Sequence, residues 1–168
     1  MADGDIKRLL ILIDEAHFGP AWHGPCLRGA LRGVTAGQAA RRPGRGRHNI
    51  WEIAVHAAYW KYAVRRRLLG EKRGRFAEKG SNWFARPLAT AAFGTEVARN
   101  KMWRRDLALL SRSHRELREA VLKIDPAALD RSSAGSRQTP RHMIAGIAMH
   151  DAYHAGQIQL LKKLMKAA

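Results

Sequence analysis

Cysteine is almost absent from this chain, and long apolar runs are missing. The single cysteine, Cys26, excludes an internal disulfide and is typical of a reducing compartment. No stretch approaches the ~18 apolar residues that a membrane-spanning helix needs. No small-residue cleavage pattern follows the short apolar run at residues 9–13, so the sequence predicts no secretory signal. We therefore expect a cytoplasmic protein without a membrane partner.

Acidic side chains are also scarce. The chain has 14 aspartates and glutamates against 31 lysines and arginines, which gives a formal net charge of +17. Such a balance favours anionic partners: nucleic acid, an anionic membrane surface or acidic small molecules. The basic residues are scattered from Lys7 to Lys166, however, and no zinc finger, ribonucleoprotein aromatic motif or long basic tail occurs. Nucleic acid is therefore the weaker alternative, and we expect a small-molecule substrate, with an anionic one favoured by the charge.

Length and periodicity predict the fold class. A chain of 168 residues can bury a real core, and we expect one domain over residues 1–168. No useful β-strand alternation and no internal repeat occurs. Four segments with helical periodicity, each with one apolar stripe, are joined by short or moderate connections. This pattern predicts an all-α fold, a four-helix bundle with a short extra N-terminal helix.

The first helical segment is interrupted. Residues 5–17 are amphipathic, and Gly19 and Pro20 then break the helix. A short second piece restarts near Pro25, because proline suits the first turn of a helix.

The other helix ends follow from capping residues. Asn49 with Glu52 resembles a variant capping box that starts the second helix at residue 50. The third helix is expected to begin between residues 95 and 101 and to run to about residue 123. Thr139 and Pro140 supply an N-cap and a first-turn proline for the last helix.

Two histidines lie in the apolar stripe of the last helix. Its members are spaced by three and four residues, so they share one face: Met143, Ile147, His150, His154, Ile158, Leu161 and Met165. The i, i+4 spacing places one imidazole a turn above the other. Two buried imidazoles repel when both are charged and lose hydration even when neutral, and a shared divalent cation removes both costs. Core histidines bound to polar neighbours are the alternative; the ligand spacing favours a metal.

A catalytic zinc-type site has three protein ligands and one open position. His150 and His154 therefore need a partner, and the sequence offers two. His56 lies in the stripe of the second helix, one turn before Trp60, and His114 lies in the stripe of the third helix. Periodicity alone cannot separate these two candidates.

The pair also has a superficial likeness to a metalloprotease motif. Residues 150–154 read His-Asp-Ala-Tyr-His, with Asp151 in the place of the general-base glutamate of H-E-x-x-H. Asp151 is one methylene shorter, and no edge strand for binding a peptide is apparent. We therefore disfavour a protease.

The helix at residues 49–69 with its single His56, followed by a last helix with His150, His154 and Gln157, resembles the DinB-like superfamily. The resemblance extends over nearly the whole chain, through the order of the helices and the placement of the histidines. It implies a DinB-like bundle in which His56, His150 and His154 bind one divalent metal ion, with zinc or nickel expected. It also implies a homodimer, and it leaves His114 as a core or pocket-wall residue.

The superfamily includes metal-dependent hydrolase-like proteins and transferases that use bacillithiol or mycothiol. The resemblance therefore implies a metal-dependent enzyme. Three neutral imidazoles suit a bound hydroxide and a bound thiolate equally. The basic charge favours a carboxylate-bearing thiol cosubstrate, so we expect a thiol-dependent S-transferase acting on small electrophiles. A metal-dependent hydrolase and a non-catalytic module that binds metal or a small ligand are the alternatives.

Further residues are candidates for the pocket around the metal. Gln157 lies three residues beyond His154 and can orient a ligand. The remaining candidates are Trp60, Tyr153, Trp22, His23 and His114. Asp151 points about 100° away from His150 around the helix, which predicts a solvent or helix contact. We expect surface positions for His17, His48 and His142, and a peripheral contact or a lid for Trp83 and Phe84.

Overall fold

The computed structural model describes residues 2–72, 74–86, 94–132 and 137–167. Helices and no strands occur in these ranges, which confirms the predicted all-α bundle. The long helices are α1 (Ala2–His17), α4 (Ile50–Leu68), α5 (Glu96–Leu122) and α6 (Pro140–Ala167). Shorter helices are α2 (Leu27–Leu31), α3 (Ala36–Ala40) and the 3-10 turn η2 (Pro126–Ala128). No helix within the described ranges is long and apolar enough to cross a membrane.

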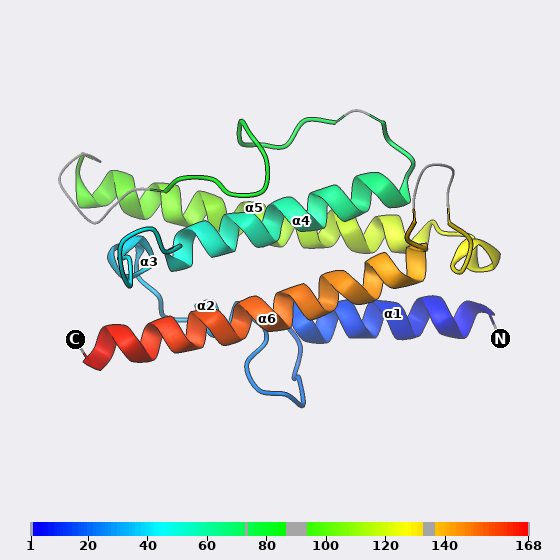
Figure 1. Cartoon of the computed structure of the whole chain (residues 1–168), viewed down its shortest axis with the longest axis horizontal. Helices are drawn as coiled ribbons and strands as arrows, with labels where there is room; N and C mark the ends of the chain where they lie inside the picture. The colour runs from blue at the N-terminus through cyan, green and yellow to red at the C-terminus, as the bar shows by residue number, and fades with distance from the viewer. Residues whose placement is uncertain (1, 73, 87–93, 133–136, 168) are drawn as a thin grey trace.

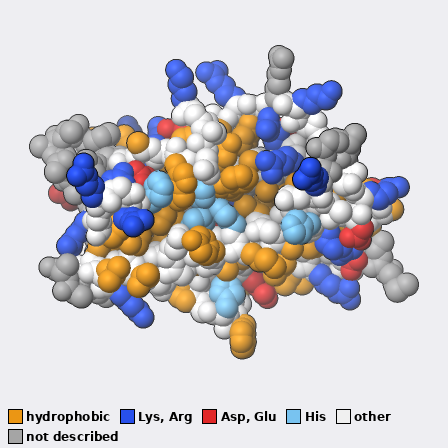
Figure 2. Space-filling model, viewed as in Figure 1, with side chains coloured by type: hydrophobic (Ala, Val, Ile, Leu, Met, Phe, Trp, Pro, Cys, Tyr) orange, Lys and Arg blue, Asp and Glu red, His pale blue; other side chains and the backbone are white. Residues whose placement is uncertain are grey.

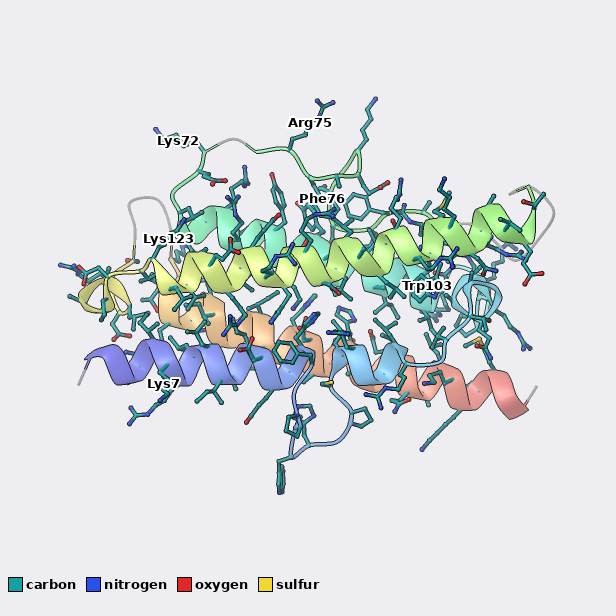
Figure 3. The ribbon with its side chains drawn as sticks, turned by 180° about the vertical axis from the view of Figure 1, so that it is seen from behind. Lys7, Lys72, Arg75, Phe76, Trp103 and Lys123 are labelled. Carbon is teal, nitrogen blue, oxygen red and sulfur yellow. The ribbon has the colours of Figure 1, made fainter. Side chains whose placement is uncertain are left out.

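The direction of the helices places one connection over the middle of the bundle. Helix α4 packs on α5, and α6 packs on α1, α2 and α4. In Figure 1, α4 and α5 run in the same direction, so the chain between them returns along the outside of α4. Lys72 and Arg75 extend outward from this returning connection (Figure 3). On its inner side, Phe76 packs against Tyr59 and Phe84.

The apolar core has two parts with a polar layer between them. One cluster joins α2, α3, the first half of α4 and the start of α5 to Ala155 and Ile158 of α6. The other joins α1 and the ends of α4 and α5 to the first turns of α6. The side chains between the two clusters are buried or half-buried and include His17, Lys61, His114, His150, Asp151 and His154. These histidines, this lysine and this aspartate are therefore concentrated at the middle of the bundle.

Three predicted helix starts are confirmed. Helix α4 begins at Ile50, where the Asn49 side chain accepts the N–H of Glu52 at 2.8 Å. Helix α5 begins at residue 96 after the N-cap Thr95. Helix α6 begins at Pro140, and the hydroxyl of Thr139 accepts the N–H of His142 at 3.2 Å. Each cap satisfies a backbone donor that the helix itself leaves unpaired.

The N-terminal half differs in detail from the expectation. Helix α1 is one of the long helices, and the short extra helices α2 and α3 follow it. Pro25 precedes α2, whose N-cap is Cys26, so this proline is outside the first turn. The Glu52 carboxylate does not complete a capping box with Asn49. It binds Arg42, His48 and the N–H of residue 86 instead, because these donors converge on it.

Candidate metal centre

Three histidines from two neighbouring helices point their Nε2 atoms at one position. His56 is on α4, and His150 and His154 are one turn apart on α6. Nε2 of His150 lies 3.1 Å from Nε2 of His56 and 3.1 Å from Nε2 of His154. The ligand atoms of all three lie within 4.8 Å of one another, and no aspartate, glutamate or cysteine of the described residues joins the group. This trio can hold a metal ion.

Hydrogen bonds at the outer nitrogens fix two of the tautomers. Nδ1 of His56 lies 2.9 Å from the backbone carbonyl oxygen of Asn82 and therefore donates to it. Nδ1 of His154 lies 2.7 Å from Oε1 of Gln157, whose amide nitrogen donates to the Tyr153 hydroxyl at 2.9 Å. A neutral imidazole that is protonated at Nδ1 carries its lone pair at Nε2. Both rings thus present an acceptor to the centre, as a metal requires.

The protons at the centre cannot satisfy all three rings. The lone pairs of His56 and His154 both point at Nε2 of His150. One proton on that atom can lie in only one of the two 3.1 Å contacts, which leaves the other as a contact between two acceptors. The other nitrogen of His150, Nδ1, is buried and has no hydrogen-bond partner in the described part of the chain. A divalent cation accepts all three lone pairs at once, so the donor set fits a metal.

Burial keeps the three rings neutral. The pKa of His56 is lowered to about 4, mainly by burial and also by the neighbouring His154 and His48, against the opposing effect of the Asn82 carbonyl. Burial, then His154 and His56, lowers the pKa of His150 to about 3. The pKa of His154 is lowered by burial as well. Neutral imidazole is the form that binds metal ions, so no proton has to leave at neutral pH.

The returning connection supplies the carbonyl that orients His56. Asn82 has φ 63°, a left-handed conformation that asparagine tolerates better than most residues. Its side-chain oxygen accepts the indole N–H of Trp60 at 3.0 Å, while its backbone oxygen accepts from His56. Trp60 lies one turn past His56 on α4, so the helix anchors the loop residue that orients its own histidine. Sequence reasoning missed Asn82; the Gly-Ser-Asn run at residues 80–82 is the turn signal that marks it.

An aromatic stack covers the outer face of His56. The Trp83 ring lies 3.8 Å from the His56 ring at an interplanar angle of 10°. His48 stacks on the other face of Trp83 at 3.6 Å and is held there by the Glu52 carboxylate at 3.0 Å. Although burial raises the pKa of Glu52, its hydrogen bonds from Arg42, His48 and the backbone lower it overall. Trp83 is thus a fixed wall of the site.

The connection is also pinned to the other helices. Arg86 donates through Nε to Asp106 of α5 at 2.7 Å, and its backbone N–H donates to Glu52 of α4 at 3.2 Å. Asp106 is fully buried and accepts the Trp51 indole N–H at 2.8 Å. Phe84 is buried in the core, so only one of the two expected loop aromatics lines the site. These contacts hold Trp83 and Asn82 over α4.

In a comparison with protein families, residues 25–158 match the DinB superfamily. The chain belongs to the DinB superfamily. The match covers most of the chain and includes the helices that carry all three histidines, which confirms the resemblance drawn from their placement. The searches of curated proteins and of solved structures found no significant match.

A second polar group lies behind the trio in this DinB bundle. The ammonium group of Lys61 forms a fully buried ion pair with Asp151, and Nδ1 of His17 lies 3.5 Å from the same carboxylate. Burial lowers the pKa of Lys61; burial raises that of Asp151, but the Lys61 charge lowers it overall. Asp151 therefore makes a helix contact, one of its two expected environments, whereas the expected surface position of His17 is wrong. Because α6 packs on α1 as well as α4, its buried arc is wider than one stripe.

His114 belongs to this second group and not to the trio. Its Nε2 donates to Asp14 at 2.9 Å, and its ring stacks on His17 with 3.9 Å between ring centroids. Burial and the neighbouring His17 lower the pKa of His114 to about 2, so the contact with Asp14 is a hydrogen bond from a neutral ring. Of the two sequence candidates for a third ligand, the structure brings His56 to the pair on α6.

The other pocket candidates fall into two sets. Gln157, Tyr153 and Trp60 take part in the hydrogen bonds around the trio. Trp22 is fully exposed and His23 is exposed, both between α1 and α2, and neither lines the cleft described next.

A cleft of about 270 Å³ opens beside His150, with walls from α4 and the first half of α6. Figure 2 shows histidine side chains at the centre of this face, with hydrophobic side chains around them and lysines and arginines at the edges. A larger cavity of about 540 Å³ lies along α2 and α5, but none of the three histidines lines it. His150 is the member of the trio that lines the smaller cleft.

Proposed function

We propose that His56, His150 and His154 bind one divalent metal ion, zinc or nickel, and that the protein is a metal-dependent enzyme. The observation that carries this proposal is the meeting of two fixed lone pairs at Nε2 of His150, which protons alone cannot satisfy. Three protein ligands leave a position for a further ligand, and the cleft beside His150 leads to it. A cation there supplies a Lewis acid that lowers the pKa of a thiol or water molecule.

The reaction that the site supports best is thiol-dependent S-transfer to a small electrophile. The thiol loses its proton to solvent and its sulfur forms a bond to the electrophilic carbon. The leaving group then departs with the bonding electrons as an anion, or the carbon–oxygen bond of an epoxide breaks and its oxygen takes up a proton from solvent. A metalloprotease-like hydrolase needs a carboxylate base beside the ligands. Asp151, the residue next to His150, is instead paired with Lys61, and no carboxylate of the described residues joins the trio. The surroundings of the three histidines thus favour a thiol nucleophile, which needs no carboxylate base.

A product assay separates the possible activities. Zinc- or nickel-loaded protein is incubated with glutathione, bacillithiol or mycothiol and a chlorinated or epoxide electrophile, and products are identified by mass. We expect an S-conjugate that requires both the thiol and an intact His150. An alcohol or diol formed without thiol would identify a hydrolase. Metal bound at one ion per chain without turnover of any substrate would leave a non-catalytic binding module.

We also propose that the protein forms a homodimer through α6. Four apolar side chains on the outer face of this helix are 51% to 69% exposed: Met149, Tyr153, Leu160 and Leu164. Their spacing of four, seven and four residues places them on one stripe, and an exposed apolar stripe favours a protein contact. Light scattering at micromolar concentration is expected to give twice the chain mass. Leu160→Glu should give the monomer, whereas a monomeric wild type would refute the proposal.

A further inference from the structure

The cleft beside His150 has a chemical character of its own. Its buried floor is apolar, formed by Val64 of α4 with Met143 and Ile147 of α6. The ring of Trp60 forms part of the wall, and its N–H is already bound to Asn82. The indole therefore offers the cleft an apolar face in a fixed orientation. Such a floor suits a flat or compact apolar group.

The polar side chains of the cleft carry positive charge or donate hydrogen bonds. The Arg67 guanidinium carbon lies 5.8 Å from the centroid of the Trp60 ring, within cation–π range, and Arg67 is an exposed residue of the cleft lining. His142 stands on the opposite wall, in the first turn of α6, where the helix dipole is positive. No acidic side chain occurs among the described residues that line the cleft. A guanidinium group beside an aromatic face is suited to a carboxylate on an apolar body.

A glycine keeps the cleft open. Gly146 lies on the wall formed by α6, and a Cβ added to it meets no atom within 4 Å. In a helix, glycine is less favourable than alanine. A larger side chain here would therefore occupy the cleft without harming the helix. Gly156, ten residues further along α6, has the same open surroundings but does not line the cleft.

We propose that this cleft binds a small organic anion. Arg67, assisted by His142, holds the anionic group, and the apolar body lies on Trp60 against Met143 and Ile147, with its far end at His150. The volume of about 270 Å³ is below the usual range for drug-sized ligands, so the ligand is a compact molecule of about the size of benzoate. The inference rests on the proposed function only in placing the reaction at the His150 end of the cleft. Binding of the anion itself needs no metal.

The test measures binding to the metal-free protein. Benzoate is titrated while the indole N–H signal of Trp60, assigned by comparison with Trp60→Phe, is followed by two-dimensional NMR. Benzyl alcohol serves as the neutral probe of similar shape. We expect a saturable shift with benzoate, and binding of benzyl alcohol about tenfold weaker. No saturable shift with benzoate, or equal binding of the two probes, would overturn the proposal.

Two pairs of variants localise the binding. Gly146→Leu is expected to abolish the benzoate shift, while Gly156→Leu retains it. Arg67→Gln should weaken benzoate binding about five- to tenfold with little effect on benzyl alcohol, since a charge-assisted contact is lost at an exposed position. Arg112→Gln removes the same charge from an exposed position on α5, outside the cleft, and should change nothing. An equal loss in both arginine variants would indicate general charge attraction and would contradict the site.

The two proposals fail separately. Benzoate binding with the expected variant pattern, in a protein that retains no metal, would support the cleft and refute the metal-dependent function. Metal retention and S-conjugate formation without benzoate binding would support the function and refute the anion-binding cleft.

Discussion

Two groups of buried or half-buried histidines lie in the middle of the bundle. One group, His56, His150 and His154, converges between α4 and α6. In the other, His17 of α1 stacks on His114 of α5. Both groups lie in the polar layer between the two apolar clusters, and burial lowers the pKa of all five of these histidines. In the first group, imidazole nitrogens meet one another. In the second, aspartates and a lysine surround the imidazoles.

The difference shows what distinguishes a metal site from a buried polar network. In the second group, Asp14 accepts from His114 and from Arg118, and Asp151 balances the charge of Lys61. These contacts compensate for part of the lost hydration, while both ring nitrogens of His17, Nδ1 of His114 and Oδ1 of Asp151 have no hydrogen-bond partner among the described residues. In the trio, the acceptors Asn82 and Gln157 take the outer protons of His56 and His154, and the two inner lone pairs meet at Nε2 of His150, which can carry only one proton. We infer that the first group is built for a cation and the second for the fold.

The largest expected effect separates the two groups by metal content. After loading with zinc or nickel and dialysis, wild-type protein should retain close to one ion per chain by elemental analysis. His56→Ala should lose tight binding, because the cation then has two protein ligands. His114→Ala should leave the stoichiometry unchanged, since this ring faces Asp14. Loss of metal in His114→Ala with retention in His56→Ala would place the centre in the wrong group.

We expect the second group, and not the trio, to determine the stability of the metal-free protein. Lys61→Met leaves the Asp151 carboxylate buried and unpaired, which should lower the free energy of unfolding by about 3–5 kcal/mol in urea titrations of metal-free protein. Lys61→Met combined with Asp151→Leu removes both charges and should recover most of that loss. Lys163→Met, at an exposed position of α6, is the control. If the single Lys61 variant is as stable as this control, the second group does not stabilise the fold.

Sequence reasoning reached the trio because helical spacing is a local property. The i, i+4 pair on α6 and His56 one turn before Trp60 follow from periodicity together with the resemblance to a family. His114 of α5 was expected as a core or pocket-wall histidine, but its neighbours were missed, because His17, Lys61 and Asp151 come from α1, α4 and α6 and none of them signals the contact alone. His17 ends its helix, and Lys61 and Asp151 fall beside their apolar stripes. Their burial depends on how wide an arc each helix buries, which only packing determines.

The connection between α4 and α5 was the other part of the site that the sequence did not predict. Asn82 and Trp83 reach the site because the chain after α4 returns along the bundle and is pinned by Arg86 on Asp106. No spacing rule connects a loop residue to a helix 26 positions earlier. The turn signal at residues 80–82 identifies a left-handed asparagine but not its histidine partner.

A moderate effect is expected from the acceptor that orients His154. Gln157→Leu removes the oxygen that takes the Nδ1 proton, so the tautomer with an Nε2 lone pair is no longer favoured. Zinc binding measured by competition with a chelator should weaken about 10- to 100-fold, the usual cost of losing an outer partner. Gln159→Leu, two residues further along α6 and so on another side of the helix, should bind zinc like wild type. Unchanged affinity in Gln157→Leu would mean that packing alone orients His154.

The smallest expected effect is a pH dependence in the second group. The pKa of His114 is about 2 in the folded protein, because of burial and the neighbouring His17, against 6.5 for an ordinary histidine. Between these values the unfolded chain binds a proton that the folded protein does not. The stability that depends on a neutral His114 is therefore complete above about pH 6.5 and is lost as the pH falls, by about 1 kcal/mol per pH unit. Urea unfolding of metal-free protein between pH 6.5 and 5 should show a shallower slope for His114→Gln than for wild type. As a control, His23→Gln at an exposed position should keep the wild-type slope. An unchanged slope in His114→Gln would instead show that the His114 ring is protonated in the folded protein and forms an ion pair with Asp14.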